Sequence, residues 1–173
     1  MADEENERKA ALIKLITSAF ENVKRGNGVS LHEADVIDDY GSKEERAAAR
    51  LLDTDYCWQD VPEAEIARHH SRISFLDAEG FRYYAPVYML WTLKYHKTSD
   101  SASDFVLYAF NPNLNTNLYE YQMERFSLFT EEQNKAVCCF LQFMSVYGED
   151  NFDREDATKA LIGYWDQFCI DGC

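Results

Sequence analysis

The sequence predicts a mostly α-helical protein of the α+β class, a single-domain assembly of about six to seven helices with a small central β-hairpin. Helix-start signals, in which Ser or Thr is followed three residues later by Glu or Gln, recur along the chain. Between these signals, apolar residues return every three or four positions. One stretch in the middle, residues 73–84, instead carries β-favouring residues around a turn.

The chain has 173 residues and no Pro-, Gly- or Ser-rich linker, which predicts one domain over residues 1–173. We expect residues 1–8, which are polar and acidic, to form a flexible lead. The apolar residues of 12–23 then recur at helical spacing. Capping boxes at Ser30 and Ser42 predict two short helices, and Pro62 opens a further short one.

The hairpin is predicted from Ile73–Leu76 and Phe81–Tyr84, two β-favouring runs on either side of a four-residue turn. Asp77 begins this turn and Gly80 ends it, a pattern typical of hairpin connections. Pro86 should end the second strand and start the next helix. A purely helical fold is the alternative, because a lone hairpin is marginal unless helices cover it.

The second half predicts two further long helices. A capping box at Thr130 precedes residues 131–147, the most hydrophobic helical segment, which we expect to be central. A last helix should follow Asp153, with its apolar residues on one side.

The formal net charge of −14 argues against binding to nucleic acids or to anionic membrane surfaces, because this field repels phosphate groups. No signal peptide and no apolar run of membrane-spanning length is evident, so we expect a cytoplasmic location. The five cysteines include no Cys-x-x-Cys pair and are interpreted as reduced thiols.

Two histidine-containing stretches are candidates for metal or acid–base sites. In "RHHSR", His69 and His70 are adjacent and point in different directions on a helix, and no carboxylate follows at zinc-protease spacing. In "HEADVIDDY", His32 and Asp35 share a helix face, but the helical-bundle metal sites draw such pairs from two helices. Both stretches are interpreted as solvated surfaces, and we expect no metal and no cofactor.

The sequence contains no nucleophile elbow, no P-loop and no cysteine with an evident base partner. Without these motifs the sequence does not decide whether the protein is an enzyme, and it favours a binding function.

The segment Phe75–Trp91 is the aromatic-rich part of the chain and the predicted binding region. Asp77, Arg82, Tyr84 and Tyr88 are its candidate binding residues, because pockets combine aromatic walls with a few polar groups. Arg82 would pair with Asp77. The alternative is that the aromatic rings fill the core and the tyrosine hydroxyls bond to nearby backbone.

The motif "FLDAEGFRYYAPVYM" over residues 75–89 resembles the core motif of an uncharacterised bacterial protein family, a domain of unknown function. The resemblance extends to residues 126–144 and to "ALIGYW" at 160–165. It implies a small intracellular protein and supplies no catalytic residue.

The leading hypothesis is an acidic, cytosolic protein-binding protein, of the inhibitor or immunity type, with a basic protein as its partner. The alternative is a small-molecule-binding protein or enzyme with a pocket near Phe75–Trp91. A homo-oligomer that pairs aromatic faces is a third possibility.

Overall fold

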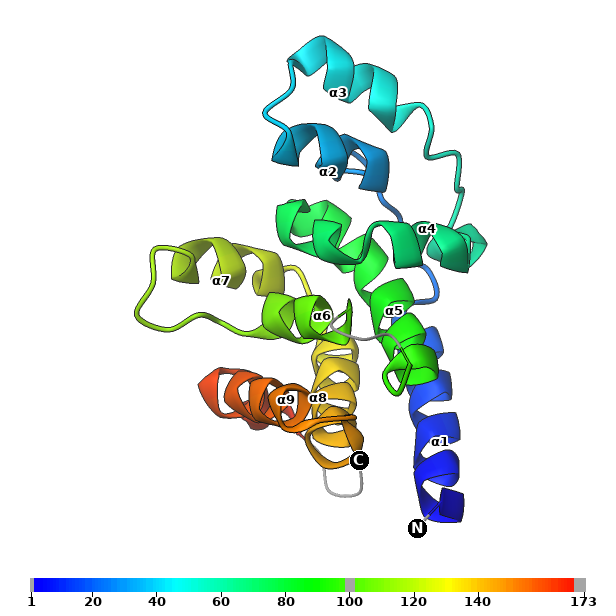
Figure 1. The fold of residues 1–173 in the computed structure, drawn as a ribbon, viewed down its shortest axis with the longest axis vertical. Helices are drawn as coiled ribbons and strands as arrows, with labels where there is room; N and C mark the ends of the chain where they lie inside the picture. Colours follow the sequence, from blue (N-terminus) through cyan, green and yellow to red (C-terminus); the bar gives the residue numbers. More distant parts are fainter. Residues whose placement is uncertain (1, 99–101, 170–173) are drawn as a thin grey trace.

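The computed structural model describes residues 2–98 and 102–169, and within these ranges every regular element is a helix. Figure 1 shows α2 and α3 at one end of the longest axis and α8 and α9 toward the other, with α5 between them. The elements are α1 (Ala2–Phe20), α2 (Leu31–Asp38), α3 (Lys43–Arg50), η1 (Trp58–Asp60), α4 (Glu63–Arg68), η2 (His70–Phe75), α5 (Ala78–Tyr95), α6 (Ala102–Phe110), α7 (Tyr119–Ser127), α8 (Glu131–Tyr147), α9 (Asn151–Gly163) and η3 (Trp165–Phe168).

The predicted β-hairpin is wrong. Its first strand lies in the 3₁₀ helix η2, and its second strand lies inside α5. Asp77 is the N-cap of α5, and its carboxylate accepts a hydrogen bond from the Gly80 N–H at 2.9 Å. An Asp followed by Gly three residues later suits a helix start as well as a turn, so the signal was assigned to the wrong element. The fold class is therefore all-α over the described residues, with nine α-helices rather than six or seven.

Pro86 lies inside α5 rather than at the start of a new helix. Proline lacks an N–H, so the Arg82 carbonyl loses its hydrogen bond within the helix. Eleven of the eighteen residues of α5, Pro86 included, are buried, and this packing sustains the helix despite the missing bond.

The core is a cluster of aromatic rings where α5, α6, α7, α8 and η3 meet. The Phe81 ring lies 5.3 Å from Phe110 and 5.8 Å from Phe129, between ring centroids. Trp165 is fully buried against Phe126, and its indole N–H donates to the Phe110 carbonyl at 2.7 Å. The helix α8 packs against both α1 and α9, so its predicted central position is confirmed.

The N-terminal residues and two of the cysteines differ from the predictions. Residues 2–8 belong to α1, and Glu5 pairs with Lys97 after α5. Cys138 on α8 forms a disulfide with Cys169, so the interpretation of these two as reduced thiols is wrong. Among the described residues, no helix combines the length and the hydrophobicity needed to cross a membrane.

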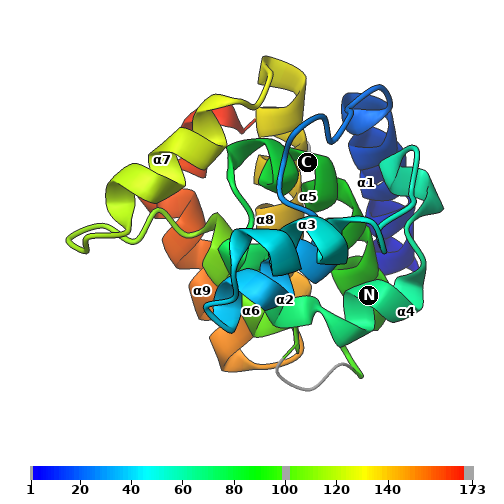
Figure 2. The same cartoon turned by 90° about the horizontal axis from the view of Figure 1, so that it is seen from above.

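The upper end of the molecule is held by polar contacts. Glu33 of α2 accepts hydrogen bonds from Arg46 and Arg50 of α3 at 2.8 and 3.0 Å. The chain entering α2 crosses the start of α5 closely, because a Cβ on Gly80 would lie 2.4 Å from the Val29 carbonyl oxygen. Only glycine fits at this crossing, which fixes where the chain enters α2. The helix α2 packs against η2, and Figure 2 shows α4 to one side of α2.

Candidate metal centre

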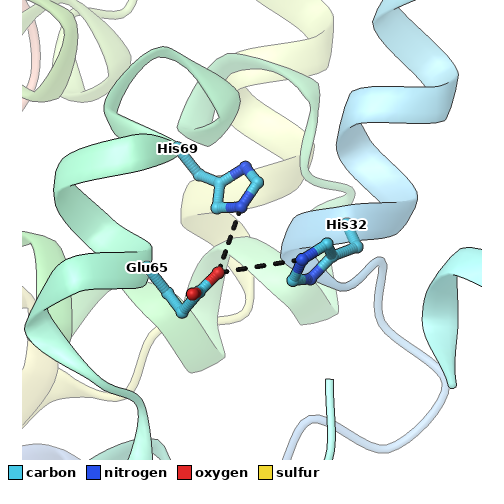
Figure 3. A group of neighbouring side chains, drawn as sticks. All are labelled: His32, Glu65 and His69. Carbon is cyan, nitrogen blue, oxygen red and sulfur yellow. Dashed lines mark ion pairs between the residues drawn. The ribbon is translucent and has the colours of Figure 1, made fainter. Parts of the chain in front are cut away.

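Three side chains from two distant parts of the sequence converge between α2 and α4 (Figure 3). His32 comes from the first turn of α2, Glu65 from α4, and His69 from the residue that ends α4. The Glu65 Oε2 atom lies 3.3 Å from His69 Nε2 and 3.7 Å from His32 Nε2. One ligand atom from each residue lies within 4.8 Å of the other two. We refer to these three residues as the triad.

The local sequence explains two members of the triad. Glu65 and His69 are four residues apart, so a helix places them on one face, one turn apart. His32 reaches them from a second helix because η2 packs against α2. The rings of His32 and His69 consequently lie 4.9 Å apart, between centroids, at an angle of 62°.

Both histidines are oriented by carboxylates on their far side. Asp53 Oδ1 lies 2.8 Å from His32 Nδ1, while its other oxygen accepts from the His32 backbone N–H at 3.0 Å. Asp35 Oδ2 lies 3.0 Å from His69 Nδ1. A carboxylate at Nδ1 favours the tautomer with the proton on Nδ1, and in that tautomer the Nε2 lone pair faces Glu65. Metal-binding histidines are fixed by carboxylates in this same way.

Asp35 is itself held in place by Arg72 of η2, which also bonds Asp38. Burial opposes the charge on Arg72, but the hydrogen bond to Asp35 and the neighbouring carboxylates outweigh it and raise the pKa of the guanidinium. Arg72 therefore remains charged and balances the negative charge of Asp35. His69 thus contacts a carboxylate that the Arg72 guanidinium holds in place.

Two triad atoms are buried polar groups without a hydrogen bond. Within the described part of the chain, neither Glu65 Oε2 nor His69 Nε2 has a hydrogen-bond partner, although 3.3 Å separates them. The His69 side chain is only 4% exposed, whereas His32 and Glu65 are 22% and 25% exposed. An unpaired buried polar group costs about 1–3 kcal/mol, so an arrangement that leaves two of them face to face requires a reason.

The two distances from Glu65 to the histidines fit a metal ion. A tetrahedral Zn²⁺ with bonds of about 2.0–2.1 Å separates its ligand atoms by roughly 3.4 Å. The two distances from Glu65 Oε2, 3.3 and 3.7 Å, bracket this value. Two imidazoles and one carboxylate supply three ligands, which leaves a fourth position for water or another molecule.

The four predicted binding residues do not form one site, and one of them, Tyr88, contacts the triad. Tyr88 is fully buried, and its hydroxyl donates to the His69 carbonyl at 2.6 Å. Burial raises the pKa of Tyr88 well above its ordinary value, so this hydroxyl keeps its proton and supports the backbone of His69. Tyr84, one turn earlier, accepts a hydrogen bond from Arg25 at 2.8 Å.

The other two predicted residues serve the fold. Asp77 caps α5 and also accepts from the Val29 N–H at 2.8 Å. Arg82 donates from Nε to Gln133 Oε1 at 2.9 Å, so its partner is an amide on α8 rather than Asp77.

Sequence reasoning missed the triad because it considered each histidine stretch alone. Glu65 lies four residues before His69, whereas the zinc-protease spacing considered for "RHHSR" requires a carboxylate that follows the histidine. His32 and Asp35 are predicted to share a helix face, but Asp35 contacts His69, and the carboxylate at His32 Nδ1 is that of Asp53. Nothing in the sequence places the two segments side by side.

A family model matches residues 8–169 of the chain. The protein belongs to a family of unknown function, DUF6714. This match confirms the predicted membership in a family without an assigned activity. No curated protein and no solved structure matches this DUF6714 chain, so the interpretation of the triad depends on its own geometry.

Proposed function

We propose that this protein binds one divalent transition-metal ion, of the Zn²⁺ type, through His32, Glu65 and His69. One observation carries the proposal: two histidines with carboxylates at Nδ1 direct Nε2 at one buried carboxylate oxygen that has no hydrogen-bond partner among the described residues. A metal ion between the three ligand atoms would satisfy all of them together.

The donor set favours zinc over the alkaline-earth ions. Imidazole nitrogen suits Zn²⁺ and its transition-metal neighbours, whereas Mg²⁺ and Ca²⁺ prefer oxygen ligands alone. Three protein ligands with one open position are typical of catalytic rather than structural zinc sites. A metal held in this way polarises a bound carbonyl or lowers the pKa of a bound water, which is the chemistry of hydrolytic reactions.

An ion-pair cluster is the competing account of the triad. In that account both histidines are protonated, and Glu65 accepts from each of them. The geometry favours the metal, because His32 Nε2 is 3.7 Å from Glu65, beyond hydrogen-bond length, and the closer His69 contact makes no hydrogen bond.

Zinc titration of the metal-stripped protein by calorimetry tests the proposal, with His69→Ala and His70→Ala as a matched pair. His70 is the next residue, but its ring faces Phe105 and its Nδ1 lies 3.0 Å from the Ala67 carbonyl oxygen. We expect one Zn²⁺ per chain in the wild type and in His70→Ala. His69→Ala should lose more than the 10–100-fold that removal of an outer hydrogen-bond partner costs.

The affinity should also fall as the pH is lowered, because a protonated imidazole cannot bind the metal. Equal zinc binding by the two histidine variants, or no binding by the wild type, would leave the ion-pair cluster as the account of the triad.

A protein-binding function is the second candidate, and one surface feature favours it. Leu51, Leu52 and Tyr56 follow α3 and are 78%, 63% and 91% exposed. Leu52 and Tyr56 line the same hollow as the exposed Asp60. An apolar strip within an acidic surface suits a basic protein partner. Affinity capture from the native host at low and moderate salt tests this: the proposal expects a basic protein that is retained by the wild type and lost by Leu51→Ser/Leu52→Ser.

A further inference from the structure

A pocket of about 510 Å³ opens beside the triad. Its volume lies within the range of about 300–1,000 Å³ that is common for small-molecule sites. His32 and Glu65 line it, so the more exposed side of the triad faces this space, while His69 is buried behind them. The other lining residues come from the start of α2 and from the segment between α3 and α4.

The pocket wall has one apolar and one acidic component. Leu31, Val61 and Pro62 supply the apolar part. Asp53, Asp55, Asp60 and Glu65 supply four carboxylates, and His32 is the one lining residue able to carry a positive charge. Such a wall attracts a cationic group and repels an anionic one.

Three of these carboxylates already have partners that fix them. Asp53 accepts from the backbone N–H of His32 and faces its ring, and Glu65 belongs to the triad. Asp55 accepts from the Tyr83 hydroxyl at 2.6 Å and lies 3.5 Å from Arg25, which balances its charge. Asp60 is different, because it is exposed and accepts a hydrogen bond from the weakly polar Cys57 thiol at 3.1 Å. Asp60 is therefore the carboxylate best placed to receive a charged group from a ligand.

We infer that this pocket binds a small molecule with an oxygen donor for the metal at one end and a cationic amine for Asp60 at the other. The inference rests on the proposed metal function, because the oxygen donor takes the fourth coordination position. The apolar wall accommodates the carbon skeleton between the two ends.

Hydroxamates test the inference, because their two oxygens bind zinc and the rest of the molecule can be varied. Glycine hydroxamate is compared with acetohydroxamate, and 6-aminohexanohydroxamate with hexanohydroxamate, by titration into zinc-loaded protein. Each pair shares chain length and differs mainly in the amine. We expect the better amine-bearing probe to bind at least about threefold more tightly than its neutral counterpart, the contribution of a solvent-accessible charge pair.

Asp60→Asn should abolish this preference without changing the zinc stoichiometry. Glu155→Gln removes an exposed carboxylate from α9, at the other end of the molecule, and should keep the preference (Figure 1). Equal or weaker binding of both amine-bearing probes, or a preference that survives Asp60→Asn, would overturn the inference while leaving the zinc site intact. A wild-type chain that binds no zinc would overturn the metal function and this inference together.

Discussion

The two ends of the molecule are stabilised by different interactions. Where α5 to α8 and η3 meet, aromatic rings pack on one another with Phe81 and Trp165 among the fully buried side chains. Where α2 and α4 meet, the contacts are between histidines, carboxylates and arginines, and His69 is almost as buried as those rings.

The contrast matters because burial has opposite consequences at the two ends. Buried apolar area stabilises the fold directly, at roughly 25 cal/mol per Å². Buried charged groups cost free energy unless each is paired, and replacing such a cluster by apolar residues is often neutral or stabilising. The aromatic rings thus need no function to explain them, although Arg125 Nε beside them also lacks a hydrogen-bond partner. At the polar end, two unpaired buried atoms, Glu65 Oε2 and His69 Nε2, face each other, and this arrangement does need an explanation.

The largest expected effect is on the aromatic end. Phe81→Ala removes a ring that contacts Phe110 and Phe129 and that lies 3.8 Å beneath the Arg125 guanidinium. We expect a loss of about 3–5 kcal/mol in the free energy of unfolding, measured by urea denaturation. Ile162→Ala, at a side chain that is 79% exposed, is the matched control and should change little.

If the two ends are separate in function, Phe81→Ala should still bind one zinc ion per chain under conditions where it is folded. A zinc site that disappears together with the aromatic ring, in folded protein, would show that the comparison between the ends is wrong.

A smaller effect is expected when a supporting carboxylate of the triad is changed. Asp53→Asn keeps the size of the side chain but weakens its hold on His32 Nδ1. Zinc affinity, measured by competition with a chelator, should fall by about 10–100-fold, the usual cost of losing such a partner. Asp60→Asn, in the same pocket wall but without a contact to a triad histidine, should leave the zinc affinity unchanged.

The smallest effect concerns a carboxylate at the α6–α9 contact. Burial, followed by the charge of Asp153, raises the pKa of Asp104 from its ordinary value of 3.8 to about 6. Ionised Asp104 is therefore disfavoured in the folded state. This penalty is absent below pH 3.8, grows between pH 3.8 and 6, and is complete above pH 6.

Asp104→Asn should accordingly raise the melting temperature at pH 7 and have a diminishing effect as the pH falls toward 4. A gain that is equally large at pH 4 and pH 7 would contradict the assigned cause. The zinc affinity should not change, because the charged neighbours of Asp104 are carboxylates of the α9 region, chiefly Asp153, and not residues of the triad.

Much of the fold could be predicted from local signals. The capping box at Ser42 forms as expected, with the hydroxyl accepting from Glu45 N–H at 3.2 Å and Glu45 accepting from Ser42 N–H at 2.7 Å. Thr130 and Gln133 do the same at the start of α8. These contacts involve residues three apart, so the sequence contains all the information that they need.

The central segment was misassigned because tertiary contacts decide its structure. Phe81, Tyr83 and Tyr84 favour strands in isolation, yet each is buried in α5 against neighbours from elsewhere in the chain. Arg25, for example, lies beside both tyrosines from a position more than fifty residues earlier.

The triad could be predicted only in part, for a related reason. Glu65 and His69 are readable as a pair at helical spacing, but His32 and Asp53 join them through folding alone. A site assembled from two helices and a loop has no contiguous motif, so its residues resemble ordinary solvated positions in the sequence.

X-ray absorption spectroscopy of the zinc-loaded protein tests the proposed zinc site at His32, Glu65 and His69 most directly. We expect a four-coordinate zinc with two imidazole nitrogens as ligands. The other ligands should be oxygens, from the carboxylate and from water or another small molecule, with bonds of about 2.0–2.1 Å. The histidine signal should fall from two imidazoles to one in His69→Ala and remain at two in His70→Ala. A spectrum without imidazole scattering, or one that includes sulfur at about 2.3 Å, would place the zinc elsewhere and contradict the account.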